Sequence, residues 1–219
     1  MIGWPRVDES LRTLAAMARE EIQRGSLRGA RLAARLASIA ARERDLWIDA
    51  VLAIDPPPPD VADLPRGAVP YLPCAVDEIV AAVIEAPLVA GDVLVDIGAG
   101  LGRVVLLAHL LSAARARGIE IQAPLVERAT ACRAALGLVE DDASFVHANA
   151  VDAPLDGNVF FLYAPCNGAM MRSVLARLER EARDRRIVLA AVGLELRDAA
   201  WPTPRATPHA SLTIYESLS

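Results

Sequence analysis

The stretch Val93-Leu-Val-Asp-Ile-Gly-Ala-Gly-Leu-Gly-Arg103 decides the fold. Its mostly apolar first half predicts a short buried strand over residues 92–97, and the apolar run after the glycines predicts a helix over residues 102–116. Glycine lets the backbone come close to a ligand, and the free N–H groups of a helix start point toward it. We therefore predict a ligand site at this turn, formed by Gly98, Ala99, Gly100 and Gly102.

Two details of the turn discriminate between the ligands that such a site could hold. The spacing is G-x-G-x-G, and Arg103 stands where a dinucleotide fingerprint needs its last glycine. Asp96, just before the glycines, would repel a pyrophosphate, but it can attract the ammonium of a methionine moiety directly or through water. The turn therefore favours S-adenosylmethionine over NAD as the cofactor.

A second segment, Gly118-Ile-Glu-Ile121, supplies a candidate ribose contact. We expect it to end a strand over residues 117–121, so that Glu120 accepts hydrogen bonds from both ribose hydroxyls, with Ile121 beside it. Glu127 is the alternative ribose ligand if the strand runs over residues 119–126 instead.

A third segment, Phe145-Val-His-Ala-Asn-Ala150, supplies candidate adenine contacts. The Asn149 side chain can bond the adenine amino group, while backbone N–H groups near Ala150 meet the ring nitrogens. Of the histidines, His109 and His147 are expected to be packed residues of the core. His209 lies in the loop that starts at Pro202, from which it could reach a substrate.

In chain order, Asp96-Ile-Gly-Ala-Gly-Leu-Gly102, Gly118-Ile-Glu-Ile121, His147-Ala-Asn149 and Phe160-Phe-Leu-Tyr-Ala-Pro165 resemble class I S-adenosylmethionine-dependent methyltransferases, over roughly residues 70–219. Within this class, the run Gly102-Arg-Val-Val-Leu106 and the Gly-Ile-Glu-Ile tetrad resemble bacterial relatives of the disruptor-of-silencing type of histone lysine methyltransferase. The resemblance implies methyl transfer to a small molecule or a protein side chain.

Two tyrosines gain a role from this resemblance. In the class, the segment here written Val69-Pro-Tyr-Leu-Pro-Cys74 commonly lies over the methionine end of the cofactor. The Tyr71 ring could face the sulfonium, an attraction of roughly 0.5–2 kcal/mol, or it could pin this segment to the sheet. Tyr163 ends the fourth expected strand, where open α/β sheets place their ligands. Tyr163 and His209 are the candidate catalytic residues.

The sequence departs from the class at two places. Asn149 stands where aspartate is usual, although its carbonyl can still accept a hydrogen bond. The segment Tyr163-Ala-Pro-Cys-Asn167 replaces the Asn/Asp-Pro-Pro-aromatic signature of enzymes that methylate amide or base nitrogens, which disfavours those acceptors. A degenerate binding module without turnover, an enzyme that uses the sulfonium charge for a rearrangement, and a nicotinamide oxidoreductase stay as alternatives.

From residue 75 onward, mostly apolar strands alternate with helices. This order predicts an α/β fold, a Rossmann-like three-layer sandwich with a mostly parallel sheet. The expected helices cover residues 75–85, 102–116, 124–136 and 170–184. The expected strands cover residues 92–97, 117–121, 144–149, 159–163, 186–192 and 211–216.

The first sixty residues predict an N-terminal helical appendage. Asp8 is the expected N-cap of a helix whose inward face carries Leu11, Leu14, Ala18 and Ile22. After a break at Gly25-Ser26, one further helical run turns Leu32, Leu36, Ile39, Leu46 and Val51 inward. The same run turns Arg28, Arg31, Arg35, Arg42 and Arg44 largely outward.

The prolines at residues 56–59 form a stiff spacer, which divides the chain into the appendage (1–60) and a cofactor-binding domain (61–219). We expect the appendage to cap the cofactor site or to mediate a homodimer.

Composition excludes several other functions. The net charge of −5 argues against a nucleic-acid partner. The absence of lysine excludes Schiff-base chemistry and a G-x-x-x-x-G-K phosphate loop. Three scattered cysteines predict free thiols and no metal site, and residues 1–10 lack a signal peptide pattern. With no apolar run long enough to cross a membrane, we expect a cytoplasmic protein.

Overall fold

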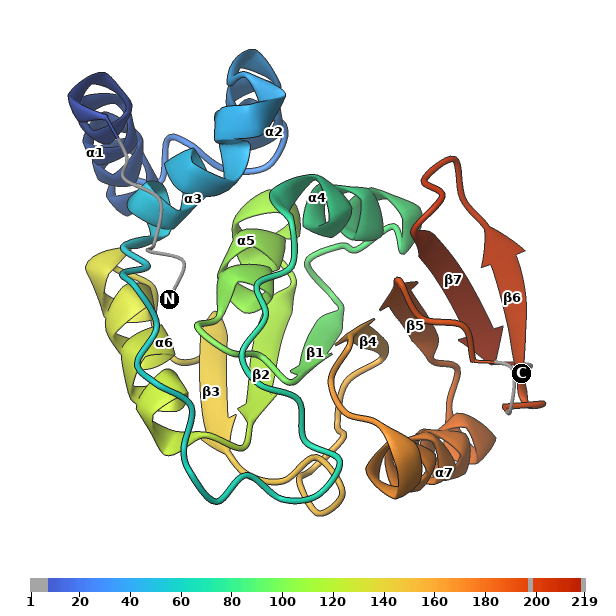
Figure 1. Cartoon of the computed structure of the whole chain (residues 1–219). Helices are drawn as coiled ribbons and strands as arrows, with labels where there is room; N and C mark the ends of the chain where they lie inside the picture. Colours follow the sequence, from blue (N-terminus) through green and yellow to red (C-terminus); the bar gives the residue numbers. More distant parts are fainter. Residues whose placement is uncertain (1–7, 197–198, 218–219) are drawn as a thin grey trace.

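The computed structural model describes residues 8–196 and 199–217, so most of the segment 1–10 considered above lies outside the described residues. Its centre is a seven-stranded sheet in the order β3-β2-β1-β4-β5-β7-β6, in which β7 runs antiparallel to both its neighbours (Figure 1). The strands are β1 (Val93–Ile97), β2 (Arg115–Glu120), β3 (Ala143–His147), β4 (Val159–Tyr163), β5 (Val188–Val192), β6 (Pro202–Ala206) and β7 (Leu212–Ser217). The predicted α/β fold with a mostly parallel sheet is confirmed.

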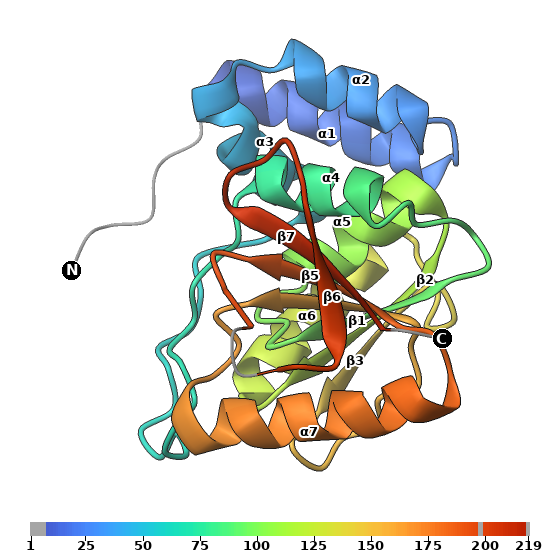
Figure 2. The same ribbon diagram turned by 90° about the vertical axis from the view of Figure 1, so that its right-hand side faces the viewer.

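Helices cover the two faces of this sheet unequally (Figure 2). Helices α4, α5 and α6 pack on one face, while α7 and irregular segments cover the other. The helices of this part are α4 (Val76–Glu85), α5 (Arg103–Ser112), α6 (Ala123–Ala135) and α7 (Gly168–Asp184). In β4, Phe160 and Leu162 face α7 whereas Phe161 faces the opposite layer, so the strand is buried on both sides, as in other parallel sheets.

The N-terminal helices form an additional layer outside α4, α5 and α6 (Figure 2). They are α1 (Glu9–Gln23), α2 (Ala30–Ser38), the short 3-10 helix η1 (Ala41–Glu43) and α3 (Arg44–Leu52). Their buried side chains, Trp47 and Ile48 among them, belong to the same hydrophobic cluster as α5 and the facing side of the sheet. The appendage and the sheet therefore share one core.

Helix α1 starts as predicted, because the Asp8 carboxylate accepts a hydrogen bond from the Leu11 N–H at 2.8 Å. Its inward face differs from the predicted one at one position. Leu14 is 46% exposed, and Ala15 is buried in its place. At 100° per residue, Leu14 lies about 60° from Leu11 around the helix, whereas Ala15 lies about 40° from it and so nearer to the stripe that Leu11, Ala18 and Ile22 define.

The single helical run predicted after Gly25 is wrong. Ile39 is extended (φ −82°, ψ 136°), which separates α2 from η1 and α3. Leu32, Leu36 and Val51 are buried as expected, while Ile39 and Leu46 are half-buried against the core.

Among the five arginines predicted to point outward, Arg31 and Arg42 are exposed, whereas Arg28, Arg35 and Arg44 are half-buried. The Arg28 Nη1 lies 3.1 Å from the His109 Nε2. His109 is buried and its Nδ1 donates to the Ala114 carbonyl at 2.9 Å, which confirms the predicted packing role.

Helix α5 is shorter than predicted. It ends at Ser112 because Ala113 adopts a left-handed conformation (φ 61°), and the N–H of Ala113 then bonds to the His109 carbonyl. Strand β2 consequently starts at Arg115 rather than at residue 117.

The C-terminal part holds a strand that the sequence did not predict. Pro202 and Pro204 indicated a loop, yet residues 202–206 form β6. This strand lies at the edge of the sheet, where proline is tolerated because one side of the strand needs no ladder hydrogen bonds.

His147 is exposed, so its predicted place in the core is wrong. It ends the other edge strand, β3, and its Nε2 donates to the Ile121 carbonyl at 3.1 Å. Within residues 8–196 and 199–217, no helix is long and apolar enough to cross a membrane.

Candidate functional site

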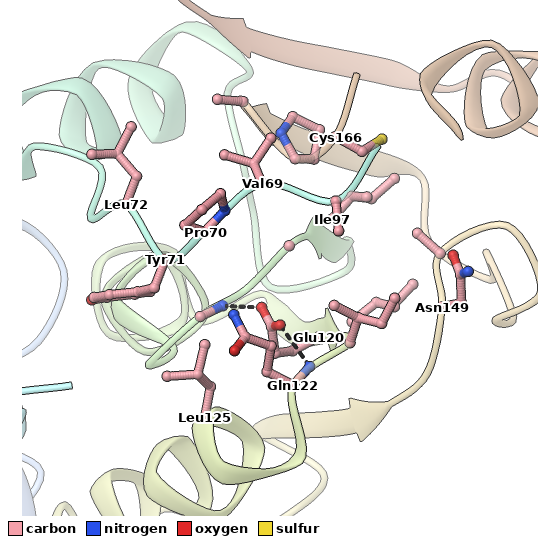
Figure 3. A pocket seen from close by; sticks show the side chains of 18 of the residues that line it. Val69, Pro70, Tyr71, Leu72, Ile97, Glu120, Gln122, Leu125, Asn149 and Cys166 are labelled. Carbon is pink, nitrogen blue, oxygen red and sulfur yellow. Dashed lines mark hydrogen bonds between the residues drawn. The ribbon is translucent and has the colours of Figure 1, made fainter. Parts of the chain in front are cut away.

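A pocket opens at the carboxyl ends of β1, β2 and β4, where parallel sheets place their ligands (Figure 3). We call it the main pocket. It encloses about 620 Å³ of empty space, part of it open to solvent, and is lined mainly by residues 68–72, 97, 98, 100, 119–122, 148–150 and 163–166. A smaller adjoining cleft, lined by Asp96, Cys74 and Arg103, shares Tyr71, Gly100 and Tyr163 with it. Three segments predicted from the sequence thus meet at one place.

The glycine turn has the close approach that its residues predict. Gly98, Gly100 and Gly102 have φ values of 85°, 54° and 82°, which side chains rarely allow. A Cβ on Gly100 would lie 2.5 Å from Cε2 of Tyr71, because the Tyr71 ring covers this part of the turn. In Figure 3 the ring lies on the side of the turn away from Asn149.

Gly118 explains why the turn can rest against β2. A Cβ at this position would lie 2.5 Å from the Ala99 Cβ and 2.8 Å from the Phe145 ring. The glycine of the Gly-Ile-Glu-Ile tetrad therefore makes room for the turn itself, a role that the sequence analysis did not assign. A glycine two residues before a strand-end carboxylate was the available signal.

Glu120 ends β2 and bonds to the glycine turn (Figure 3). Its Oε2 accepts from the Gly100 N–H at 2.8 Å, and its Oε1 accepts from the Gln122 N–H at 2.9 Å. The residue is 6% exposed, and this burial raises the pKa of its carboxyl. A carboxylate offers about four lone pairs, so two stay available for hydroxyl donors. Glu127 lies exposed on α6, and the alternative strand over residues 119–126 is wrong.

Asp96 is the most unusual group of the site. It is 3% exposed, and no described residue donates a hydrogen bond to its carboxylate. Burial, with the nearby charge of Glu120 as a second cause, raises its pKa to about 8. A buried carboxyl without a partner destabilises a protein, and such groups are concentrated at functional sites.

The polar group expected at the adenine end is Asn149, which lines the main pocket together with Ala150 and Ile121. Its Oδ1 accepts from the Val151 N–H at 3.1 Å, which uses one of its two lone pairs. Among the described residues, none bonds to the other lone pair or to the two amide N–H groups. Asn149 thus keeps one acceptor for an amino group.

Tyr163 borders both the main pocket and the adjoining cleft. It is half-buried, and burial together with the neighbouring Cys74 and Glu78 raises the pKa of its phenol. Ala164, the next residue, has a left-handed φ of 42°. His209 lies exposed in the turn between β6 and β7, and among the described residues it does not line the main pocket.

Residues 55–75, which we call the connecting segment, are held beside the pocket by hydrogen bonds. Gln122 makes the principal contacts, because its Nε2 donates to Asp60 at 2.8 Å and its Oε1 accepts from the Val61 N–H at 2.9 Å. The Asn167 N–H donates to the Gly67 carbonyl at 2.8 Å. Helices α1–α3, expected as a cap, do not line the pocket; this wall comes from residues 68–72. Gln122 is thus a residue of the site that was not predicted from the sequence.

The pocket carries acidic side chains, of which Asp96 keeps its proton up to about pH 8 in the ligand-free protein and would ionise beside an ammonium. Glu120 lines the main pocket, Asp96 borders the adjoining cleft, and Arg103 of that cleft is already paired with two aspartates. In the part of the chain that the structure describes, no three His, Cys, Asp or Glu side chains come together as metal ligands. The site suits a ligand with positive charge and hydroxyl donors.

The sequence matches no family model and no curated protein. The fold, however, matches solved structures. An RNA methyltransferase from Salinibacter ruber, in complex with S-adenosyl-L-homocysteine, aligns at a TM-score of 0.50 and 21% identity, over 67% of this chain and 92% of that one. The Escherichia coli protein yhhF, provisionally assigned as a methyltransferase, aligns at 0.50 and 20% identity, over 68% and 88%. This likeness establishes a methyltransferase-like Rossmann fold.

Proposed function

We propose that this chain is an S-adenosylmethionine-dependent methyltransferase that acts on a small molecule or a protein side chain. One observation carries the proposal: two buried carboxyl groups, Asp96 and Glu120, border the glycine turn, and Asp96 has no hydrogen-bond partner among the described residues. A ligand with an ammonium at one end and ribose hydroxyls at the other would satisfy both groups. NAD has the hydroxyls but would bring its pyrophosphate toward Asp96.

The residues present fit this cofactor part by part. Glu120 would accept the ribose hydroxyls through the lone pairs that Gly100 and Gln122 leave available. Asn149 and the backbone near Ala150 would bind the adenine, and Asp96 the ammonium. When bound, S-adenosylmethionine supplies a methyl group activated by its positively charged sulfur. A sulfonium and an ammonium would also favour the ionised forms of the Asp96 and Glu120 carboxyl groups.

The contribution of the protein would then be alignment and exclusion of water. Holding an acceptor in line can supply about 7–11 kcal/mol of the barrier, so no acid–base dyad is needed. The raised pKa of Tyr163 keeps its phenol protonated, so it would orient an acceptor as a hydrogen-bond donor rather than act as a base. His209, in the turn between β6 and β7, is the second candidate catalytic residue. Ser211, two residues later, donates to Glu78 of α4 at 2.6 Å, so this turn adjoins α4.

A second function, cofactor binding without turnover, is favoured by one observation. The Asn149 side chain, where the class usually has aspartate, already accepts a hydrogen bond within its own turn. The resemblance to relatives of the disruptor-of-silencing enzymes favours the first function, with a protein lysine as the methyl acceptor. A methyltransferase and a binding module would both bind S-adenosylmethionine, and they differ in whether the methyl group is transferred.

Transfer of labelled methyl groups tests the proposal. The purified protein is incubated with radiolabelled S-adenosylmethionine and with separate metabolite and protein pools. Label in either pool supports a methyltransferase and identifies the acceptor class, while binding without transfer supports the second function. Asp96→Asn, which keeps the shape of the side chain, should abolish transfer. A protein that neither binds the cofactor nor transfers label would overturn both functions.

A further inference from the structure

The first residue of α5 connects the glycine turn to the N-terminal helices. Arg103 follows Gly102 directly and is 6% exposed. Its guanidinium makes a two-pronged bond to Asp49 of α3, with Nε–Oδ1 and Nη2–Oδ2 distances of 2.9 Å and 2.6 Å. Its Nη1 donates to the Cys74 carbonyl at 2.6 Å and lies 3.3 Å from the Asp45 carboxylate. One side chain thus joins the turn, α3 and the end of the connecting segment.

The ion pair between Arg103 and Asp49 is better suited to orienting the Arg103 side chain than to stabilising the fold. Asp49 is 4% exposed, so both charges are removed from water, and such pairs seldom stabilise a fold more than apolar residues would. A two-pronged arginine–carboxylate bond does fix the direction of the guanidinium plane. Because the Arg103 backbone continues the turn, fixing its side chain also fixes where α5 begins.

We propose that Asp49 is a positioning residue for the glycine turn, acting through Arg103 so that the N-terminal helices set the affinity for the methionine end of the cofactor. This inference rests on the proposed function. It assigns the helices a role although none of their described residues lines the main pocket. It also separates the two ends of the site. The ribose and adenine contacts, Glu120 and Asn149, come from β2 and the segment after β3. Glu120 bonds to the turn at Gly100 but is also held by the Gln122 N–H, so we expect the ribose end to depend on Asp49 less than the methionine end does.

The chain offers a matched control for this contact. Arg44 of α3 pairs with Asp77 of α4 at 2.8 Å, so this bond also joins the N-terminal helices to the layer formed by α4, α5 and α6. The Asp77 side chain is 56% exposed, and the pair does not touch Arg103. Asp77→Asn therefore breaks an ion pair between the same two layers without releasing the turn.

The experiment compares two ligands by calorimetry in wild type, Asp49→Asn, Arg103→Lys and Asp77→Asn. S-adenosylhomocysteine reports on the whole site, and adenosine reports on the ribose and adenine end alone. Asp49→Asn should weaken S-adenosylhomocysteine at least tenfold and adenosine less than threefold. Arg103→Lys keeps the charge but not the two-pronged bond, and it should show the same split. Asp77→Asn should bind both ligands as the wild type does.

Hydrogen exchange of the ligand-free proteins provides a second readout that needs no cofactor. The Gly102 and Leu106 amides, which bond to the Ala99 and Gly102 carbonyls, should exchange at least tenfold faster in Asp49→Asn than in Asp77→Asn. Equal weakening of both ligands in Asp49→Asn and Arg103→Lys, or unchanged exchange, would overturn the inference. A wild type that binds neither ligand would instead overturn the proposed function, and the exchange rates would still decide whether Asp49 holds the turn.

Discussion

Replacing Glu120 with alanine perturbs the ribose end of the site in two measurable ways. The Gly100 and Gln122 N–H groups lose their acceptor, and each buried N–H left unpaired costs about 1–3 kcal/mol. Because the pocket is partly open to water, we expect the lower end for each, a loss of about 2 kcal/mol in the free energy of unfolding. The ribose loses charge-assisted hydrogen bonds of about 1.5–3 kcal/mol, or about 10- to 100-fold in affinity.

Calorimetric titration with S-adenosylhomocysteine measures the loss of affinity, and urea unfolding measures the loss of stability. Glu120→Gln keeps one acceptor oxygen and should fall between wild type and alanine in both. Glu127→Ala is the control, because Glu127 is exposed on α6 and should change affinity less than twofold. Weak binding by Glu127→Ala together with normal binding by Glu120→Ala would refute the assignment of the ribose end.

Three further predictions concern Asp96, Gly100 and the N-terminal helices. The Asp96 pKa of about 8 means that the folded protein holds a proton that the unfolded chain releases near pH 4. Stability of the ligand-free wild type should therefore fall as pH rises from about 4 to 8. Urea unfolding of Asp96→Asn should show a smaller fall, which persists in part because burial also raises the pKa of Asp49 to about 6 and the pKa of Glu120. Gly100→Ala places a Cβ against the Tyr71 ring at a φ of 54°, so calorimetry should detect no S-adenosylhomocysteine binding; wild-type affinity would show that the turn is not the site. Deleting residues 1–60 exposes the core shared with Trp47 and removes both aspartate partners of Arg103. Circular dichroism should show an unfolded or aggregated product, and a folded, monodisperse one would contradict the shared core.

The sequence predicted the elements that a local pattern specifies. Apolar runs marked β1 and β4, alternating glycines marked the turn, and the position of Glu120 at a strand end followed from the tetrad around it. These features recur because a buried parallel strand must be apolar and because the backbone must pass close to a ligand. The fold class followed from the order of such elements.

Features that depend on contacts between distant residues were not predictable. Ala113 ends α5 without glycine or proline to mark the end, and β6 contains two prolines that edge pairing accommodates. Arg103 was noted only as a departure from a glycine fingerprint, since its partner Asp49 is 54 positions away in the chain. The Gln122 contacts with Asp60 and Val61 depend on the path of the connecting segment, which its prolines do not specify.

The most direct test of the central claim is a comparison of S-adenosylhomocysteine and NAD as ligands of the purified protein. Asp96 favours an ammonium and disfavours a pyrophosphate, so only S-adenosylhomocysteine should stabilise the fold. At a ligand concentration roughly a hundredfold above the dissociation constant, the free energy of unfolding should rise by about 2.7 kcal/mol, measured by thermal shift and confirmed by calorimetry. Stabilisation by NAD alone, with no response to S-adenosylhomocysteine, would contradict the proposed site and function.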